Sequence, residues 1–231
     1  FLSSSKWTTI TSPFGALYAT ISYPVARILD TLYSHVWVHK SSMYDIDTTK
    51  NAVVFCASHS SYLDFVLLPF IMYLFPEAFQ VQRPHIVACE SFSKIPILGN
   101  CLRYAGAIFI SRKKGERGKS ATSPGLTIND IFLSKLLAKK EGNVPVSFIL
   151  FPWGTRSRDD MPLKGKTGAL RAIRRAAQSI GATVEYVSVG ITYDRRLDES
   201  LLFEEKVRTT GGHARGVLLQ LVPWLARIFY T

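Results

Sequence analysis

The chain has 231 residues and a net charge of +11 at pH 7, because 28 lysines and arginines outnumber 17 aspartates and glutamates. With 47% hydrophobic and 19% charged residues it is not a disordered chain, and its length is sufficient for one α/β domain with a sizeable core. The charge predicts an anionic partner, such as a phosphorylated metabolite or a negatively charged bilayer. No nucleic acid is expected, because neither a zinc-finger spacing nor an aromatic ribonucleoprotein strand occurs.

The first predicted segment, residues 1–40, is apolar but interrupted. Residues 7–26 carry no charge, yet serines, threonines, glycine and prolines recur among them. A membrane-spanning helix is normally more uniformly apolar, so we predict a helical segment that lies at a membrane interface. A helix packed on the domain is an equally good alternative. Residues 41–231 are then predicted to form the single functional domain.

A junction between a strand and a helix follows at residues 53–64. The β-branched and aromatic run 53–55 predicts a buried strand, the polar residues 58–61 interrupt it, and apolar residues continue at helical length to about Phe75. His59 is therefore expected in the turn between the two elements.

The spacing of His59 and Asp64 allows these two side chains to meet across that junction. With Ser61 as the N-cap, Asp64 takes the third helical position, where a carboxylate is favoured. There it could accept a hydrogen bond from one imidazole nitrogen, fix the tautomer and leave the other nitrogen as a base, as in a catalytic triad without its nucleophile. A capping box beside an unrelated histidine is the alternative, and these residues alone favour it.

Strands and helices alternate along the rest of the chain. Strands are predicted at 85–89, 107–111, 146–151 and 184–191, and helices within 94–104, 126–141 and 168–179. This alternation predicts an α/β domain with a mixed, largely parallel central sheet that is flanked by helices on both faces. Ligands of such sheets bind at the carboxyl ends of the strands.

Polar groups follow three of the predicted strands. They are His59 with Asp64, then Arg112, and then the loop 154–158. Because the carboxyl ends of parallel strands share one edge of a sheet, we expect these groups in one site. The cationic run 112–119 and the arginines of helix 168–179 are best explained as solvated surface, with CoA phosphates or anionic lipid as the alternative for the helix.

Four segments in this order resemble the glycerolipid acyltransferases with a His-x4-Asp motif, the superfamily of glycerol-3-phosphate and lysophosphatidate acyltransferases. The segments are His59-Ser-Ser-Tyr-Leu-Asp64, Gly106-Ala-Ile-Phe-Ile-Ser-Arg112, Phe151-Pro-Trp-Gly-Thr-Arg-Ser-Arg158 and Val187-Ser-Val-Gly-Ile-Thr-Tyr-Asp194. The likeness covers roughly residues 50–195. Pro84-His-Ile-Val-Ala, Lys166-Thr-Gly-Ala-Leu and Tyr193-Asp-Arg195 are more similar to the glycerol-3-phosphate and dihydroxyacetone-phosphate branch.

The resemblance implies transfer of a fatty acyl group from acyl-CoA, or an acyl carrier protein, to a hydroxyl of glycerol 3-phosphate in phospholipid synthesis. Lysophosphatidate and dihydroxyacetone phosphate are the alternative acceptors. His59, oriented by Asp64, is expected to be the general base. The residues expected to hold the acceptor and its phosphate are Arg112, Gly154, Thr155, Arg156 and Lys166. A membrane surface is the expected further partner, and no cofactor is expected.

One residue departs from the family pattern. Trp153 stands where the third block of the family has a glutamate that arranges the polyol-phosphate site, and an indole cannot accept those hydrogen bonds. This departure leaves open a catalytically silent relative that binds lipid.

The remaining polar and sulfur-containing residues have simpler interpretations. The three cysteines, Cys56, Cys89 and Cys101, lie in apolar stretches without metal-ligand spacing, which predicts reduced core thiols and no metal site. Together with the interfacial segment, they predict a membrane-associated protein whose site faces a reducing compartment. Cys56 is close to His59 in sequence, but a buried strand favours a core role over a nucleophile. Arg158 could equally pair with Asp159 or Asp160.

Overall fold

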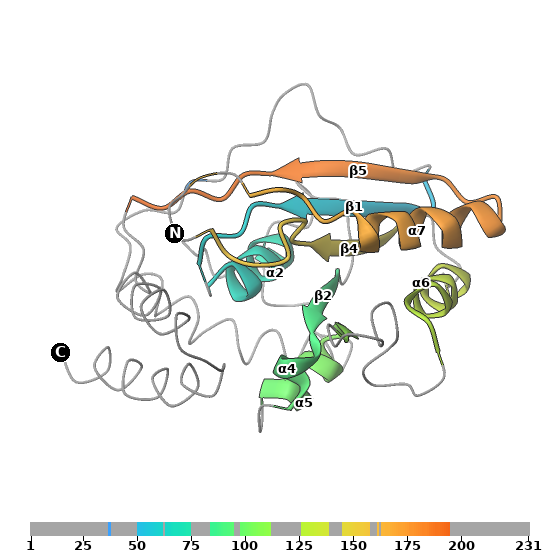
Figure 1. The fold of residues 1–231 in the computed structure, drawn as a ribbon, viewed down its shortest axis with the longest axis horizontal. Helices are drawn as coiled ribbons and strands as arrows, with labels where there is room; N and C mark the ends of the chain where they lie inside the picture. The colour runs from blue at the N-terminus through green and yellow to red at the C-terminus, as the bar shows by residue number, and fades with distance from the viewer. Residues whose placement is uncertain are drawn as a thin grey trace.

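A computed structural model describes residues 37, 50–61, 63–74, 84–94, 98–111, 126–138, 145–157, 161 and 163–194. These residues form a five-stranded sheet in the order β3-β2-β4-β1-β5, and every pair of neighbouring strands is parallel (Figure 1). The strands are β1 (Ala52–Ala57), β2 (His85–Cys89), β3 (Ile108–Ile110), β4 (Val146–Leu150) and β5 (Val184–Val189). The predicted α/β class and all five predicted strands are confirmed.

Helices α5, α6 and α7 lie within their predicted ranges, whereas the short helix α4 was not predicted. Helix α6 starts with a capping box, in which the Thr127 side chain accepts from the Asp130 amide and the Asp130 carboxylate accepts from the Thr127 amide. None of these helices combines the length and apolar character that crossing a membrane requires. The helices are α2 (Asp64–Leu74), α4 (Glu90–Ser93), α5 (Leu98–Tyr104), α6 (Ile128–Leu137) and α7 (Gly168–Ser179).

Both faces of the sheet are covered by helices, as predicted. Alternate residues of β1 point to opposite faces, so Val54 packs in a core with Phe132 of α6 and Ile173 of α7. Phe55, one residue later, packs in a second core with Leu68 of α2. The sheet is therefore the middle layer of three, with α6 and α7 on one face and α2 on the other (Figure 1).

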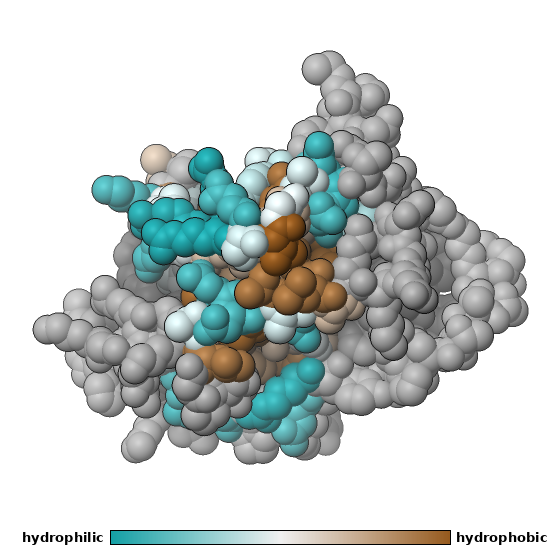
Figure 2. Space-filling view, turned by 90° about the vertical axis from the view of Figure 1, so that its right-hand side faces the viewer, coloured by the Kyte–Doolittle hydropathy of each residue, from teal (hydrophilic) through white to brown (hydrophobic). Residues whose placement is uncertain are grey.

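One end of the sheet carries an exposed apolar patch. Figure 2 views the end where the strands begin, and an apolar patch lies there among polar side chains. Leu137, the last residue of α6, and Ile180, which follows α7, are 63% and 39% exposed. The predicted interfacial segment, residues 1–40, lies outside the described residues apart from the exposed Trp37.

Candidate active site

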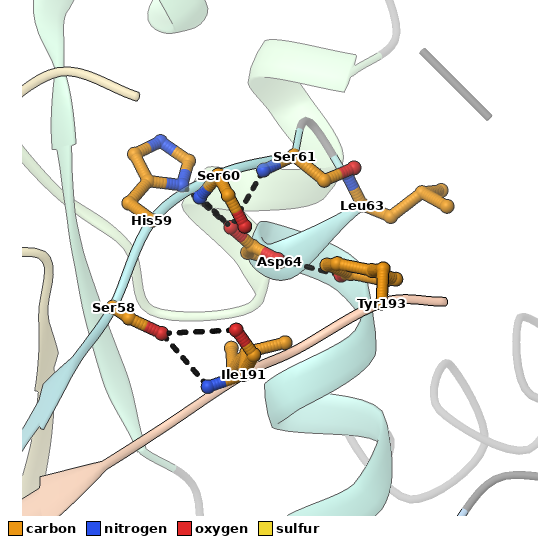
Figure 3. Close-up of polar contacts among 8 residues, drawn as sticks. All are labelled: Ser58, His59, Ser60, Ser61, Leu63, Asp64, Ile191 and Tyr193. Carbon is orange, nitrogen blue, oxygen red and sulfur yellow. Dashed lines mark hydrogen bonds and ion pairs between the residues drawn. The ribbon is translucent and has the colours of Figure 1, made fainter. Parts of the chain in front are cut away.

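The segments that follow β1 and β5 are hydrogen-bonded to each other at the carboxyl end of the sheet. The Ser58 amide donates to the Val189 carbonyl at 2.9 Å. The Ser58 hydroxyl then accepts from the Ile191 amide at 2.7 Å and donates to the Ile191 carbonyl at 3.3 Å (Figure 3). These bonds hold the segment after β5 against the turn that carries His59.

His59 and Asp64 meet in that turn. His59 Nδ1 lies 2.9 Å from Asp64 Oδ2. The same carboxylate oxygen accepts from the Ser60 amide at 2.9 Å and the Ser61 amide at 3.0 Å, so the backbone of the turn wraps around it (Figure 3). The predicted contact between the two side chains is therefore present, and the capping-box alternative does not describe it.

The position of Asp64 on the helix differs from the prediction. Asp64 is the first residue of α2 and not the third, because the first helical hydrogen bond runs from the Leu67 amide to the Leu63 carbonyl at 2.7 Å. The Ser61 hydroxyl accepts from the Leu63 amide at 3.1 Å, inside the turn that precedes the helix. Asp64 still lies in the first turn, where the helix dipole favours a carboxylate.

The hydrogen bonds of Asp64 determine the tautomer of His59. When the carboxylate is ionised it only accepts hydrogen bonds, and Nδ1 of a neutral His59 then carries the proton and Nε2 the lone pair. A histidine in this state can take a proton at Nε2, and the adjacent carboxylate stabilises the imidazolium that results.

The pair lies in an apolar, aromatic surrounding. Asp64 is fully buried and His59 is 5% exposed. The His59 ring contacts Phe65 edge-on at 4.9 Å and Phe151 at 4.4 Å between centroids, and Phe92 of α4 packs on Phe65. Low polarity strengthens the charge interaction between His59 and Asp64.

The loop after β4 lies beside the same turn. Strand β4 neighbours β1 in the sheet, with Leu150 in register with Cys56. Beyond the strand, the Ser157 amide donates to the His59 carbonyl at 2.7 Å, and the buried Ser157 hydroxyl donates to the Met161 carbonyl at 2.8 Å. Ser157 therefore connects the loop to the backbone of His59, a role that the sequence pattern did not assign to it.

Gly154 shapes the first turn of this loop. Its φ is +65°, a conformation that favours glycine, and its amide donates to the Phe151 carbonyl at 2.8 Å. The Lys166 amide donates to the Pro152 carbonyl at 2.6 Å, and a Cβ at Gly154 would lie 3.1 Å from Lys166 Cδ. The glycine thus lets the Lys166 side chain lie across the loop.

The other predicted ligands of the acceptor are only partly placed. Thr155 and Lys166 are exposed and Arg156 is half-buried, all in or beside the loop after β4. Arg112 and Arg158 lie outside the described residues. Strand β3, which precedes Arg112, is three strands from β1, so its end lies roughly 14 Å away.

Several other sequence predictions concern the surroundings of the pair. Cys56 is half-buried and burial raises the pKa of its thiol, which agrees with a core role. Trp153 is partly buried. Among the described residues no three histidine, cysteine or carboxylate side chains cluster in a way that could hold a metal ion.

Tyr193 is the residue of this site that the motif spacing missed. Its hydroxyl donates to Asp64 Oδ1 at 2.5 Å (Figure 3). Tyr193 belongs to the fourth block, but 129 residues separate it from Asp64. The neighbouring positions of β1 and β5 bring the two together, and the sequence carries no signal for that arrangement.

Comparisons with known proteins assign the family. A model described as Acyltransferase matches residues 35–192. The chain is 28% identical over 183 residues to the dihydroxyacetone phosphate acyltransferase of Bos taurus, covering 78% of this chain and 25% of that protein. It is 30% identical over 175 residues to the glycerol-3-phosphate acyltransferase of Xylella fastidiosa strain M12, covering 72% of this chain and 18% of that protein. The chain thus spans about a quarter or less of the length of these curated relatives.

Among solved structures, the 1-acyl-sn-glycerophosphate (LPA) acyltransferase PlsC from Thermotoga maritima aligns over 90% of this chain and 87% of that chain. The identity is 20% and the TM-score 0.46, too distant to support an argument. The family model, in contrast, covers well over half of the sequence, and it confirms the resemblance of the four blocks. The chain therefore belongs to the acyltransferase family.

Proposed function

We propose that this chain is the catalytic domain of an O-acyltransferase that moves a fatty acyl group from acyl-CoA, or from an acyl carrier protein, to a hydroxyl of glycerol 3-phosphate. The observation that carries the proposal is the 2.9 Å contact between His59 Nδ1 and Asp64 Oδ2. Relatives named glycerol-3-phosphate acyltransferase and dihydroxyacetone phosphate acyltransferase support the class of acceptor.

His59 acts as the general base in this proposal. Its Nε2 takes the proton of the acceptor hydroxyl while the hydroxyl oxygen attacks the thioester carbonyl carbon, a transfer worth roughly 10²- to 10⁴-fold in rate. The carbon–sulfur bond then breaks, and the thiolate leaves and takes the proton from the imidazolium. A thiolate is a good leaving group, so no covalent acyl-enzyme is required, and the thioester supplies the driving force without a metal or cofactor.

The basic residues near the loop after β4 would hold the acceptor. Arg156 and Lys166 supply positive charge, Thr155 a hydroxyl and Gly154 the turn that presents them, and Arg112 would join them from the end of β3. Guanidinium groups match phosphate oxygens in a bidentate way, and an ammonium adds a point charge. The acceptor's phosphate is thus proposed to lie on this side of His59.

The setting of the enzyme is part of the proposal. The acyl chain and the acylated product are lipids, so the domain works at a membrane surface, where the net charge of +11 favours an anionic bilayer. Two free cysteines, Cys56 and Cys89, suit a reducing compartment.

The test is release of free thiol from acyl-CoA, followed with glycerol 3-phosphate, dihydroxyacetone phosphate and lysophosphatidate in turn. We expect acceptor-dependent release that is fastest with glycerol 3-phosphate. A higher kcat/KM for lysophosphatidate or dihydroxyacetone phosphate would reassign the acceptor. Release that does not depend on any acceptor would show hydrolysis instead of transfer.

Trp153 motivates a second candidate, a catalytically silent relative that binds lipid. An indole cannot replace the hydrogen bonds of a carboxylate at the acceptor site. If this residue alone silences the chain, Trp153→Glu should produce acceptor-dependent thiol release that the parent chain lacks. Equal, measurable turnover of parent and variant would reject the silent candidate.

A further inference from the structure

The two oxygens of the Asp64 carboxylate are held by different parts of the chain. Oδ2 accepts from His59 and from the amides of Ser60 and Ser61, all within the turn after β1. Oδ1 accepts from the hydroxyl of Tyr193, which among the described residues is its only donor. A fully buried carboxylate thus has four hydrogen bonds, and one of them arrives from the segment after β5.

Contacts other than that hydrogen bond fix the position of the Tyr193 ring. Two residues earlier, Ile191 is bound through both its amide and its carbonyl by the Ser58 hydroxyl. The Tyr193 ring itself packs with Leu67 and Phe70 on α2. The hydroxyl is therefore presented to Asp64 by a segment that is already anchored to β1 and to α2.

From this geometry we infer that Tyr193 is a positioning residue of the site, which holds the plane of the Asp64 carboxylate so that Oδ2 stays aimed at His59 Nδ1. Rotation about the Cβ–Cγ bond moves both carboxylate oxygens together, so a donor on Oδ1 opposes any rotation that would turn Oδ2 away from His59. Residues that orient metal-binding histidines typically change activity about 10- to 100-fold when they are removed, and we expect an effect of the same order for this orienting contact. The catalytic consequence rests on the proposed function.

Tyr193→Phe removes the hydroxyl and keeps the ring that packs on α2. We expect kcat for acyl transfer to fall about 10- to 100-fold, while the KM values for acyl-CoA and the acceptor stay within about twofold. The proton NMR resonance of His59 Nδ1–H, assigned by its loss in His59→Gln, should change position. A residue that only stabilised the fold would not move this resonance in a folded variant.

Tyr186→Phe is the matched control, because Tyr186 is an exposed tyrosine of β5 away from the His59 turn. It should keep the parent kcat and the parent resonance, and thermal unfolding of each variant shows that folded proteins are compared. If Tyr193→Phe does not fold, Ser58→Ala loosens the Ile191 anchor instead and should lower kcat less.

An unchanged kcat in folded Tyr193→Phe, or a lowered kcat with an unmoved resonance, overturns the inference. A moved resonance in a chain without any acyl transfer supports the positioning and rejects the proposed function.

Discussion

Two histidines lie at different levels of the parallel sheet and differ in what holds them. His59 follows β1 at the carboxyl end, and its Nδ1 meets the Asp64 carboxylate at 2.9 Å. His85 begins β2 in register with Phe148 in the middle of β4, and its Nδ1 donates to the Gly106 carbonyl at 2.7 Å. Both rings pack near a phenylalanine of the β4 region, Phe151 for His59 and Phe148 for His85.

The two histidines are both at least partly buried and share a bound Nδ1, and they differ in the charge of the group that binds it. Each histidine has its Nδ1 proton bound, so each carries its lone pair on Nε2. Only His59 has a negative charge beside it to stabilise an imidazolium. Burial lowers the pKa of His85, with the Lys135 charge acting in the same direction and the bond to Gly106 opposing it. The neutral form of His85 is thus favoured.

The largest effect should come from removing the proposed base. His59→Ala should lower kcat about 10²- to 10⁴-fold, because it removes the imidazole whose Nε2 is proposed to take the proton of the acceptor. His85→Gln, which can still donate to the Gly106 carbonyl, is the matched control and should stay within about threefold of the parent. Thiol release under saturating acceptor measures both. Loss of less than tenfold in His59→Ala would show that His59 is not the base.

Asp64→Asn would replace the charged acceptor of His59 with a neutral amide oxygen, comparable to the Gly106 carbonyl that binds His85. The amide oxygen can face the three donors on the Oδ2 side while the amide nitrogen donates to the Tyr193 hydroxyl, so the tautomer is kept and only the charge is lost. A charge-assisted hydrogen bond is worth about 1.5 to 3 kcal/mol, so kcat should fall roughly 10- to 150-fold. A fall as large as that of His59→Ala would instead indicate the wrong tautomer.

The sequence alone predicted the secondary structure around both histidines. Apolar runs and the polar or glycine residues that interrupt them predicted all five strands, and helix α7 spans its predicted residues Gly168–Ser179. These elements depend on neighbours in the chain, and so a pattern of neighbours is sufficient to find them. The spacing of His59 and Asp64 across a turn allowed their contact, but that segment alone favoured a capping box, and the polar groups after the other strands were needed to favour a site.

The non-local parts could not be read in the same way. The strand order places β1 between β4 and β5, and periodicity carries no information about order. For that reason Tyr193, which depends on β5 lying beside β1, was missing from the predicted site. The helical position of Asp64 was wrong by two residues, because it depends on which carbonyl accepts the first helical bond.

Two glycines with positive φ, one beside His85 and one in the loop near His59, allow the two regions to be compared by the free energy of unfolding. Gly106 (φ +79°) closes α5, and a Cβ there would lie 2.9 Å from Nδ1 of His85. A Cβ at Gly154 (φ +65°) would lie 3.1 Å from Cδ of Lys166, whose long side chain can move aside. Either change to alanine should cost about 1 to 2 kcal/mol in backbone strain, and Gly106→Ala more, since the bound His85 ring must also move. Denaturant unfolding measures the free energies. A change in the KM of the acceptor is expected only for Gly154→Ala. The same change in Gly106→Ala would contradict the assignment of acceptor binding to the region of His59 alone.

The smallest effect should be the dependence of stability on pH through His85. Its pKa in the folded chain is below the ordinary value of 6.5, so below that pH the unfolded chain binds a proton that the folded chain does not. The contribution of His85 to the free energy of unfolding is therefore complete above pH 6.5 and is lost as the pH falls from 6.5 through the lower folded pKa. His85→Gln, which does not titrate, should show a shallower loss of stability than the parent between neutral pH and about pH 5, measured by urea unfolding. Parallel curves for parent and variant would mean that His85 is as readily protonated in the folded chain as in the unfolded one, and the contrast with His59 would then rest on the Asp64 carboxylate alone.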